Sequence, residues 1–230
     1  MSANRSASRS SRGGSASRLT RNPSAGGDTA GEQAAQQVRI IGGQWRRTPL
    51  PVPVSSGLRP TPSRVRETLF NWLGQDLAGW RVLDAFAGSG ALGLEAASRG
   101  ADHVVMLEKV PALARSIQAV CDRLKATQVR VQQGDALAWM GQPRQHAQFD
   151  LVFLDPPFEA DLFEAALQRA IPCVPLGGWV YLESPHAYHG ELGVPCPAGL
   201  NLYRHGQAGA VHFHLFQRVA VAAESAQATV

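Results

Sequence analysis

The segment Leu154-Asp155-Pro156-Pro157-Phe158 combines residue types that suit the binding of a planar amino group. Two successive prolines fix two φ angles and remove two amide donors, which leaves the Asp155 carboxylate and the Pro156 carbonyl as a rigid pair of acceptors. An exocyclic amine of a nucleobase has two N–H donors and a lone pair delocalised into the ring. Two acceptors can turn that lone pair towards an incoming group, a contribution of positioning and electrostatics.

The ring of Phe158 offers a face on which a base can stack once it has left its own helix or loop. We therefore expect Asp155, Pro156 and Phe158 to be catalytic residues at a base amine. The alternative is a proline-stiffened loop with a structural aspartate. The position of the segment at the end of an apolar strand argues against that alternative.

A second group of residues follows the first strand of the main domain. The run Asp84-Ala85-Phe86-Ala87-Gly88-Ser89-Gly90 stands where an apolar strand turns into a helix. Glycines at such a turn let the backbone approach a ligand closely, and open α/β sheets bind ligands at the carboxyl ends of their strands. We expect Asp84, Phe86, Gly88 and Gly90 to bind a cofactor.

Two more acids end the next two strands. Glu108 lies 24 residues after Asp84, close to the offset of about 20 residues at which an acid meets a ribose hydroxyl. Asp135 ends the third strand, where it could accept a hydrogen bond from an adenine amino group. No pyrophosphate cradle is obvious, so a nucleoside without phosphates is expected, of which S-adenosyl-L-methionine is the common one. A nicotinamide oxidoreductase is disfavoured.

The elements that must position these residues alternate between strand and helix. The expected strands are 81–85, 103–107, 129–132, 149–154 and 179–183, and the expected helices are 62–73, the glycine turn to 97, 111–125, 136–140 and 161–171. Two further strands, 200–204 and 210–217, are joined by glycines as a hairpin. The pattern predicts an α/β, doubly wound, mostly parallel seven-stranded sheet with an antiparallel C-terminal hairpin.

The first helix of the main domain has a start signal and an apolar stripe. Thr61 can cap it, with Pro62 in the first turn. The stripe that should be buried repeats at helical spacing and comprises Val65, Leu69, Trp72 and Leu73. Arg64 and Glu67 fall on the opposite, polar side.

The charge is unevenly distributed along the 230 residues. Residues 1–66 hold 11 basic and two acidic residues, a net charge of +9, and residues 67–230 hold a net charge of −5. A basic arm ahead of an acidic body indicates a nucleic-acid partner. No run approaches the roughly 18 apolar residues of a membrane span, so a soluble protein is expected.

No metal site or disulfide framework is expected. The three cysteines, Cys121, Cys173 and Cys196, form no C-x-x-C pair, which favours a reducing compartment. His212 and His214 share one strand face, but a third ligand is not apparent. We interpret them as two histidines of an edge strand.

The N-terminal part divides into a tail and a hairpin. Residues 1–37 are rich in Ser, Gly, Ala and Arg and are expected to form a disordered basic tail. Residues 38–60 begin with two expected strands, 38–41 and 45–50, joined by a turn at Gly42-Gly43. Residues 38–66 hold six arginines and no acid. Arginine pairs with phosphates and stacks on bases. The expected RNA-binding residues are Arg39, Trp45, Arg46, Arg47, Arg59, Arg64 and Arg66. A solvated surface is the alternative.

The two strand-end motifs together resemble the class I S-adenosylmethionine-dependent methyltransferases that act on exocyclic base amines. The form D-P-P-F does not choose between adenine N6, cytosine N4 and guanine N2. Three N-terminal blocks, VRIIGGQWR at 38–46, GLRPT at 57–61 and RVRETLFNWL at 64–73, closely resemble the RsmD family. With 86–95 and 155–158, the resemblance covers about residues 38–218.

The resemblance implies methylation of N2 of one guanine in bacterial small-subunit (16S) rRNA. Asp84, Gly88 and Gly90 would shape the pocket, Glu108 would bind the ribose hydroxyls and Asp135 the adenine edge. Asp155 and Pro156 would hold the guanine amine, and Phe158 would stack on the base. The partner would be 16S rRNA, within the 30S subunit or an assembly intermediate, and the enzyme a cytoplasmic monomer.

Two other functions are compatible with parts of the sequence. DNA adenine N6 methylation uses the same chemistry. A non-catalytic RNA-binding module is disfavoured by the intact segment Asp155–Phe158. The expected domains are a tail over 1–37, the hairpin extension over 38–60, a methyltransferase domain over 61–218 and a disordered tail over 219–230.

Overall fold

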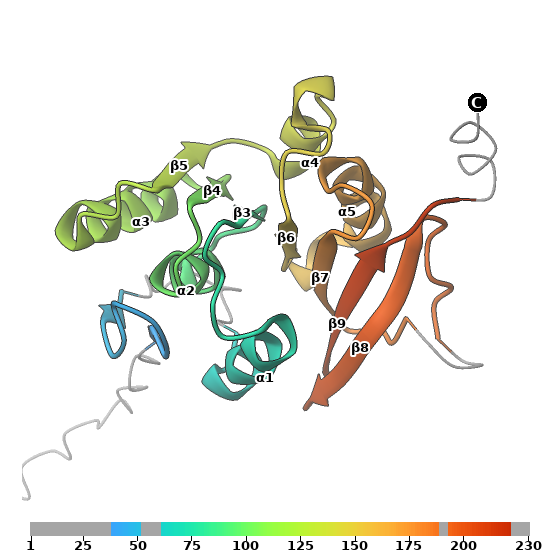
Figure 1. Cartoon of the computed structure of the whole chain (residues 1–230), viewed down its shortest axis with the longest axis horizontal. Helices are drawn as coiled ribbons and strands as arrows, with labels where there is room; N and C mark the ends of the chain where they lie inside the picture. The colour runs from blue at the N-terminus through green and yellow to red at the C-terminus, as the bar shows by residue number, and fades with distance from the viewer. Residues whose placement is uncertain (1–37, 52–60, 189–192, 222–230) are drawn as a thin grey trace, which may run out of the picture. The chain divides into compact units, whose positions relative to one another are not determined.

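The computed structural model describes residues 38–51, 61–188 and 193–221. Seven strands form one sheet in the order β5-β4-β3-β6-β7-β9-β8 (Figure 1). They are β3 (Arg81–Asp84), β4 (His103–Glu108), β5 (Val129–Gln133), β6 (Leu151–Leu154), β7 (Trp179–Ser184), β8 (Leu200–Ala208) and β9 (Val211–Arg218). The first five pair in parallel, and β9 and β8 are antiparallel. The fold class predicted from the sequence is confirmed.

The order of the strands creates a switch point between β3 and β6. After β3 the chain moves outward through β4 and β5, and then returns to the other side of β3 as β6 and β7. Ligands of such sheets bind outside the carboxyl ends of the strands at this point. The ends of β3, β4, β6 and β7 therefore define where a site should be sought.

Helices cover both faces of the sheet, which is why the middle positions of its central strands are apolar. The helices are α1 (Ser63–Leu73), α2 (Ala91–Ser98), α3 (Pro111–Leu124), α4 (Ala136–Met140) and α5 (Phe163–Ala170). Residues of α1, α2 and α3 share one buried cluster with Val82 and Phe153, and residues of α4 and α5 share another with Leu83 and Val152. All four residues of β6 are buried, as expected for a strand covered on both faces.

The N-terminal hairpin packs on this body. Its strands β1 (Val38–Arg39) and β2 (Pro49–Leu50) are shorter than expected. Val38, Ile40 and Leu50 are buried in the same cluster as α1 and α2. The strands are short because much of the backbone between them bonds to α2 instead.

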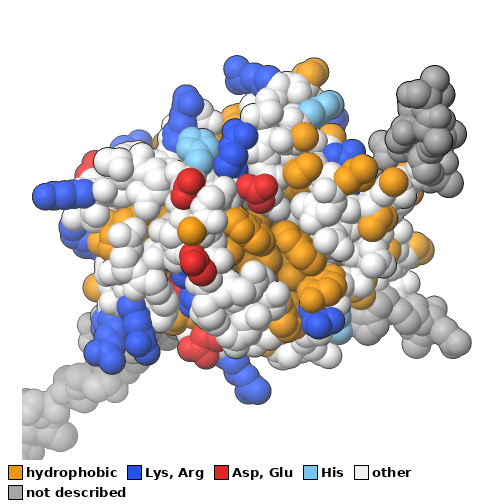
Figure 2. All heavy atoms as spheres, viewed as in Figure 1, with side chains coloured by type: hydrophobic (Ala, Val, Ile, Leu, Met, Phe, Trp, Pro, Cys, Tyr) orange, Lys and Arg blue, Asp and Glu red, His pale blue; other side chains and the backbone are white. Residues whose placement is uncertain are grey.

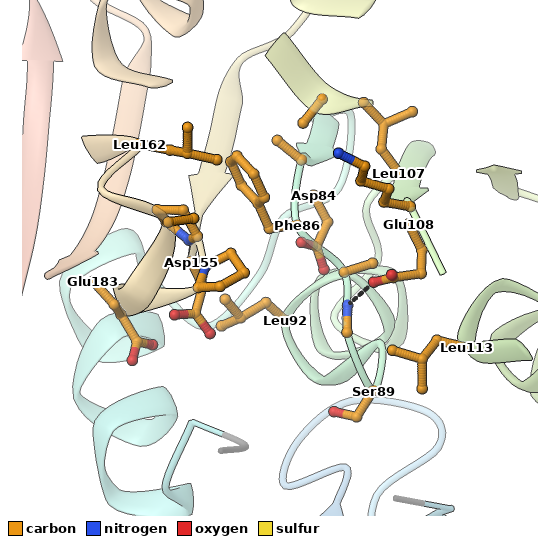
Figure 3. A pocket seen from close by; sticks show the side chains of 18 of the residues that line it. Asp84, Phe86, Ser89, Leu92, Leu107, Glu108, Leu113, Asp155, Leu162 and Glu183 are labelled. Atoms are coloured by element: carbon orange, nitrogen blue, oxygen red, sulfur yellow. Dashed lines mark hydrogen bonds between the residues drawn. The ribbon is translucent and has the colours of Figure 1, made fainter. Parts of the chain in front are cut away.

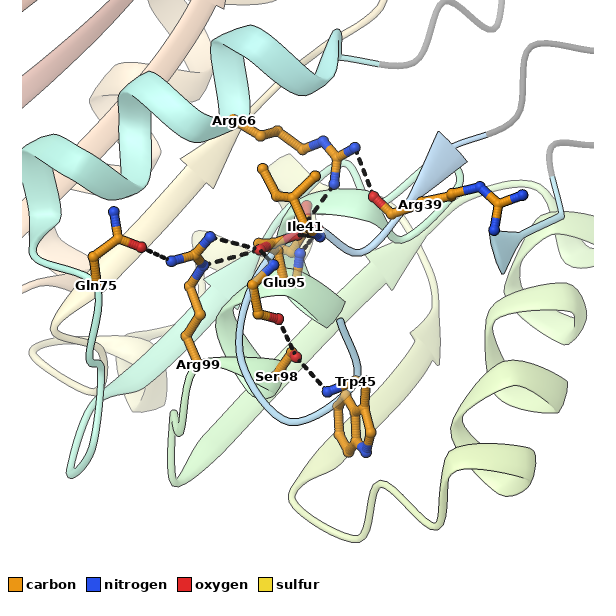
Figure 4. Close-up of polar contacts among 11 residues, drawn as sticks. Arg39, Ile41, Trp45, Arg66, Gln75, Glu95, Ser98 and Arg99 are labelled. Atoms are coloured by element: carbon orange, nitrogen blue, oxygen red, sulfur yellow. Dashed lines mark hydrogen bonds and ion pairs between the residues drawn. The ribbon is translucent and has the colours of Figure 1, made fainter. Parts of the chain in front are cut away.

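The hairpin is fastened by the carboxylate of Glu95 on α2, which is fully buried (Figure 4). It accepts hydrogen bonds from the backbone N–H groups of Ile41 at 2.8 Å and Gly42 at 2.7 Å. It also pairs with Arg66 at 3.2 Å and with Arg99, the C-cap residue of α2, at 2.9 Å. One carboxylate thus joins the hairpin, α1 and α2.

This cluster corrects the expectation for Arg66. Its side chain was expected to contact RNA, but Arg66 is 1% exposed. Besides its ion pair with Glu95, it donates to the carbonyl oxygen of Arg39 at 2.9 Å. A guanidinium held inside the fold cannot reach a phosphate, so the RNA-binding prediction is wrong for this residue.

The Gly42-Gly43 turn has no room for side chains. A Cβ on Gly42 would lie 2.3 Å from the guanidinium of Arg99, and a Cβ on Gly43, which has φ +71°, would lie 1.8 Å from the carbonyl oxygen of Ser98. The Ser98 hydroxyl donates to the Gly42 carbonyl at 2.6 Å and accepts from the Trp45 amide at 2.9 Å. The two glycines therefore permit direct contact with the end of α2.

Details of α1 differ from expectation. Its N-cap is Pro62, and no side chain caps it, so the capping role predicted for Thr61 is wrong. The buried residues of α1 are Val65, Arg66, Leu69 and Phe70. Trp72, expected in the stripe, is only half-buried and stacks on Phe213 of β9 at 5.3 Å between ring centroids.

The histidines were expected on an edge strand, but β9 is an inner strand and β8 forms the edge. His214 is buried and its Nε2 accepts a hydrogen bond from the Tyr188 amide at 3.1 Å.

Across the described ranges, no group of three or more His, Cys, Asp and Glu is arranged to hold a metal ion. In the same ranges, no helix has the length and apolarity needed to cross a membrane.

Candidate active site

A cavity of about 580 Å³ opens at the carboxyl ends of β3, β4, β6 and β7 (Figure 3). This volume falls within the roughly 300–1,000 Å³ of pockets that bind small molecules. The predicted cofactor and catalytic residues that line it are Asp84, Phe86, Gly88, Glu108, Asp135, Asp155, Pro156 and Phe158. Of the residues expected there, Gly90 is not among the lining residues.

Asp84 shapes the turn between β3 and α2. Its carboxylate is buried and accepts a hydrogen bond from the Gly93 amide at 2.9 Å. Gly90 has φ +80°, and a Cβ there would lie 3.1 Å from the side chains of Leu94 and Met106. Gly90 therefore serves the shape of the turn.

The glycines of this turn, Gly88, Gly90 and Gly93, also have the G-x-G-x-x-G spacing of dinucleotide-binding turns. The glycines alone therefore do not exclude a dinucleotide.

The electrostatics of Asp84 follow from its burial. Desolvation raises the pKa of its carboxyl to about 7, the hydrogen bond from Gly93 opposes this shift, and the negative charge of Glu108 adds to it. Burial of a carboxylate disfavours its charged form. A cationic ligand in the cavity would favour ionised Asp84, so the site suits a ligand that carries positive charge.

Glu108 closes the other side of the same turn. Its two oxygens accept from the Gly88 amide at 2.8 Å and from the Val110 amide at 2.7 Å. A carboxylate has about four lone-pair sites, so each oxygen can accept one more hydrogen bond. Glu108 lines the cavity, and its two remaining acceptor positions fit the paired hydroxyls of a ribose.

Asp135 is exposed at the rim of the cavity. It caps α4 by accepting from the Ala138 amide at 3.0 Å, and Lys109 lies 3.4 Å away. The hydrogen bond from Ala138, followed by that from Lys109, lowers the pKa of Asp135 although partial burial opposes the shift. It is therefore an ionised acceptor, already engaged as a helix cap.

The segment that follows β6 forms the opposite wall. Pro156 is buried, and Asp155 and Phe158 are half-buried. The Phe158 ring packs edge-on against Phe163 with 5.8 Å between centroids. The Thr61 hydroxyl donates to Asp155 Oδ2 at 3.5 Å. Thr61 thus orients a carboxylate 94 residues further along the chain, a role that local sequence does not reveal.

Glu183 is a buried acid of the cavity wall that the sequence reasoning missed. It lies in β7 directly after Leu182, which pairs with Leu154 of β6, so Glu183 and Asp155 stand side by side at the same sheet edge. Glu183 lines the cavity and is 4% exposed. An acid at the carboxyl end of a strand was the signal used for Glu108 and Asp135, and the same signal would have found it.

Burial of its carboxyl raises the pKa of Asp155 well above its usual range. The negative charges of Glu183 and Asp84 add to this shift, and the hydrogen bond from Thr61 opposes it. Like-charged carboxyls in one pocket cannot all ionise easily. Three acids therefore face a small volume in which an amine or a cation would be stabilised.

The residues expected to bind RNA lie away from the cavity walls. Arg39, Arg46, Arg47 and Arg64 are exposed, and Figure 2 shows Lys and Arg side chains gathered over the region of the hairpin. Trp45 is half-buried and packs against the core, so only part of its ring is accessible. Arg59, residues 1–37 and residues 222–230 lie outside the part of the chain that the structure describes.

The strand order, the glycine turn and the acids at the strand ends define a class I methyltransferase fold. A solved putative methyltransferase of Escherichia coli superposes with a TM-score of 0.69 and 40% identity, covering 79% of this chain and 98% of that one. A putative methylase of Haemophilus influenzae gives a TM-score of 0.66 and 34% identity, covering 80% of this chain and 99% of that one.

The sequence comparisons identify the family. The family described as "Conserved hypothetical protein 95" matches residues 38–217. The ribosomal RNA small subunit methyltransferase D of Escherichia coli strain K12 is 43% identical over 191 residues, which cover 80% of this chain and 91% of that protein. The chain belongs to this family, the RsmD family of methyltransferases, as the sequence motifs predicted.

Proposed function

We propose that this protein transfers a methyl group from S-adenosyl-L-methionine to the exocyclic N2 amine of a guanine in 16S rRNA. The observation that carries the proposal is the placement of the Asp155–Pro156 acceptor pair across one cavity from Glu108 and Asp84. Relatives named as small-subunit rRNA methyltransferases support an rRNA substrate. Guanine N2 follows from the motifs shared with the RsmD family.

The residues present fit the cofactor. Glu108 has acceptor capacity for the two ribose hydroxyls, and Asp135 is an ionised acceptor at the rim for the adenine amino group. The carboxyls of Asp84 and Asp155 line the cavity, and a bound sulfonium would favour their ionised forms. When bound, S-adenosyl-L-methionine supplies an electrophilic methyl group on that sulfonium.

Asp155 and the Pro156 carbonyl accept the two N–H groups of the guanine amine and so direct its lone pair into the cavity. Thr61 fixes Oδ2 of Asp155 by its hydrogen bond, which leaves Oδ1 for the amine. Phe158, braced by Phe163, stacks on the unstacked base. The methylated nitrogen loses one proton, and Asp155 Oδ1 accepts it. The raised pKa of Asp155 suits this role.

The exposed arginines of the hairpin and of α1 are proposed to bind the rRNA backbone. Arg39, Arg46, Arg47 and Arg64 are exposed and carry a charge that pairs with phosphates. The substrate would be 16S rRNA within the 30S subunit or an assembly intermediate. A ribosomal substrate implies a cytoplasmic enzyme, and we propose that it acts as a monomer.

The experiment is transfer of labelled methyl groups to small-subunit particles from cells that lack the protein. One guanine should be labelled, and base analysis should identify N2-methylguanine. Label on adenine of DNA would indicate the alternative enzyme instead. Absence of label on rRNA, with cofactor binding shown by calorimetry, would refute the proposed reaction.

A variant tests the acceptor pair. Asp155→Ala should lose methyl transfer by at least about 100-fold, because positioning and electrostatics supply the rate, while cofactor binding persists. Asp122→Ala, at an exposed position of α3, is the control and should keep full activity. Full activity of the Asp155 variant would contradict the mechanism.

A further inference from the structure

Two carboxylates are placed side by side at the catalytic end of the cavity, and the mechanism uses only one. Asp155 holds the amine, whereas Glu183 has had no role so far. In Figure 3 both carboxylates lie on the side of the pocket that Leu92 lines. A second buried acid beside Asp155 makes ionisation of Asp155 harder, so the placement of Glu183 there is unfavourable for the stability of the fold. Acids whose ionisation is made harder by burial and by like-charged neighbours are common at functional sites.

The carboxylate of Glu183 is held in a fixed position. The hydroxyl of Tyr181, two residues earlier in β7, donates to Glu183 Oε1 at 3.0 Å. Tyr181 is fully buried, its ring packs edge-on against Phe153 at 6.0 Å, and burial raises the pKa of its hydroxyl well above the usual range. It therefore stays a donor at every physiological pH. Glu183 is thereby presented to the cavity as an acceptor.

A fixed acceptor beside the amine site distinguishes guanine from the other amino bases. Guanine carries a ring N1–H donor next to its N2 amine, so its edge offers adjacent donors. Adenine and cytosine carry an unprotonated ring nitrogen next to their amines, and that nitrogen is an acceptor. An acceptor on the protein would pair with guanine and would oppose the lone pair of the other two bases.

We propose that Glu183 accepts the N1–H of the target guanine while Asp155 and Pro156 hold its N2 amine, and that Glu183 thereby selects guanine. The proposal rests on the proposed function. It assigns the choice of base to a residue outside the Asp155–Phe158 segment, which does not itself choose among the amino bases. Tyr181 is the positioning residue that keeps the Glu183 carboxylate in place.

The test replaces the guanine N1–H without removing the amine. Small-subunit particles are reconstituted on ligated rRNA that carries guanine or 2-aminopurine at the methylated position. 2-Aminopurine keeps the N2 amine but has an unprotonated N1. The measured quantity is the ratio of kcat/KM for guanine over 2-aminopurine. The wild-type ratio should be large, because a site built to bind a donor rejects an analogue that lacks it.

Glu183→Gln should lower this ratio by about 10- to 100-fold, the worth of a hydrogen bond to a charged group. The amide can still accept from Tyr181, and its NH₂ can donate to N1 of 2-aminopurine. Glu164→Gln, exposed on α5, is the matched control and should keep the wild-type ratio. The effect of the missing O6 of 2-aminopurine cancels because every variant meets the same two substrates.

Tyr181→Phe provides a second test that leaves the carboxylate in place. Its ratio should fall by up to about tenfold, because Glu183 keeps its carboxylate but loses the hydrogen bond that holds it in position, and the cofactor affinity should be unchanged. A wild-type ratio near one, or an unchanged ratio in Glu183→Gln and Tyr181→Phe variants that bind cofactor normally, would overturn the role of Glu183 and leave the proposed function intact. Failure of the wild type to methylate guanine would refute both.

Discussion

Replacing Glu95 with alanine should lower the free energy of unfolding by about 3–5 kcal/mol. The carboxylate accepts from two backbone amides and pairs with Arg66 and Arg99, and its exposed fraction is 0%. Removal of one partner from a buried ion pair costs about 3–5 kcal/mol because a buried charge is left uncompensated. Domains are stable by only about 5–15 kcal/mol, so the loss is a large fraction of the total.

The assay is urea unfolding followed by circular dichroism at pH 7. Glu67→Ala, an exposed acid on α1, is the matched control and should change stability by less than about 0.5 kcal/mol. Hydrogen exchange should locate the loss, because the amides of Ile41 and Gly42 lose their acceptor and should exchange faster than those of β3.

A double-mutant cycle measures the interaction between Glu95 and Arg66 separately from the effect of losing either side chain alone. Glu95→Ala combined with Arg66→Met should cost less than the sum of the two single changes, since the second removes a charge that the first leaves unpaired. If Glu95→Ala cost less than about 1 kcal/mol, or if the two changes were additive, this carboxylate would not be what holds the hairpin, α1 and α2 together.

Three further outcomes are expected. Glu108→Ala should weaken S-adenosyl-L-methionine binding at least about tenfold by calorimetry, because the acceptor for the ribose and the bonds to Gly88 and Val110 are lost together; unchanged affinity would place the ribose elsewhere. The pKa of Asp84 is raised to about 7, so the folded state holds a proton that the unfolded state releases, and the free energy of unfolding should fall as the pH rises from about 4 to about 7. Asp84→Asn should flatten that slope by up to about 1.4 kcal/mol per pH unit, and an unaltered slope in urea titrations would contradict the shift. Charge reversal of Arg46 and Arg47 to Glu should weaken rRNA binding. The slope of log K against log salt concentration should become shallower by about 0.7–0.9 for each phosphate that is no longer neutralised. An unchanged slope would show that these two arginines do not contact phosphates.

The sheet could be predicted because its signals are local. Apolar runs such as Leu151–Leu154, separated by helical periodicity, are enough to assign strands, helices and a parallel topology. The interior position of β9 was missed because pairing with β7 depends on contacts distant in sequence. The length of β1 and β2 was overestimated since their backbone bonds to Glu95 and Ser98, which local sequence does not reveal.

The composition of the cavity wall was predictable where one residue type at one strand end suffices, as for Asp84, Glu108 and Asp155, which all line the cavity and whose roles stay predictions. It was not predictable where a side chain has a distant partner. Arg64 and Arg66 are alike in sequence, yet one is exposed and the other is buried against Glu95. Thr61 resembled a helix cap, and its contact with Asp155 arises only from the packing of α1 beside β6.

The fastening of the hairpin determines how its role in RNA binding can be studied. Truncation before residue 61 would strip Val38, Ile40 and Leu50 from the core and leave Glu95 without two of its donors. A shortened protein would therefore lose activity through damage to α2, whose first residues follow the cofactor turn. Loss of function on deletion would say nothing about RNA, and only surface substitutions at the hairpin can separate substrate recognition from the integrity of the catalytic domain.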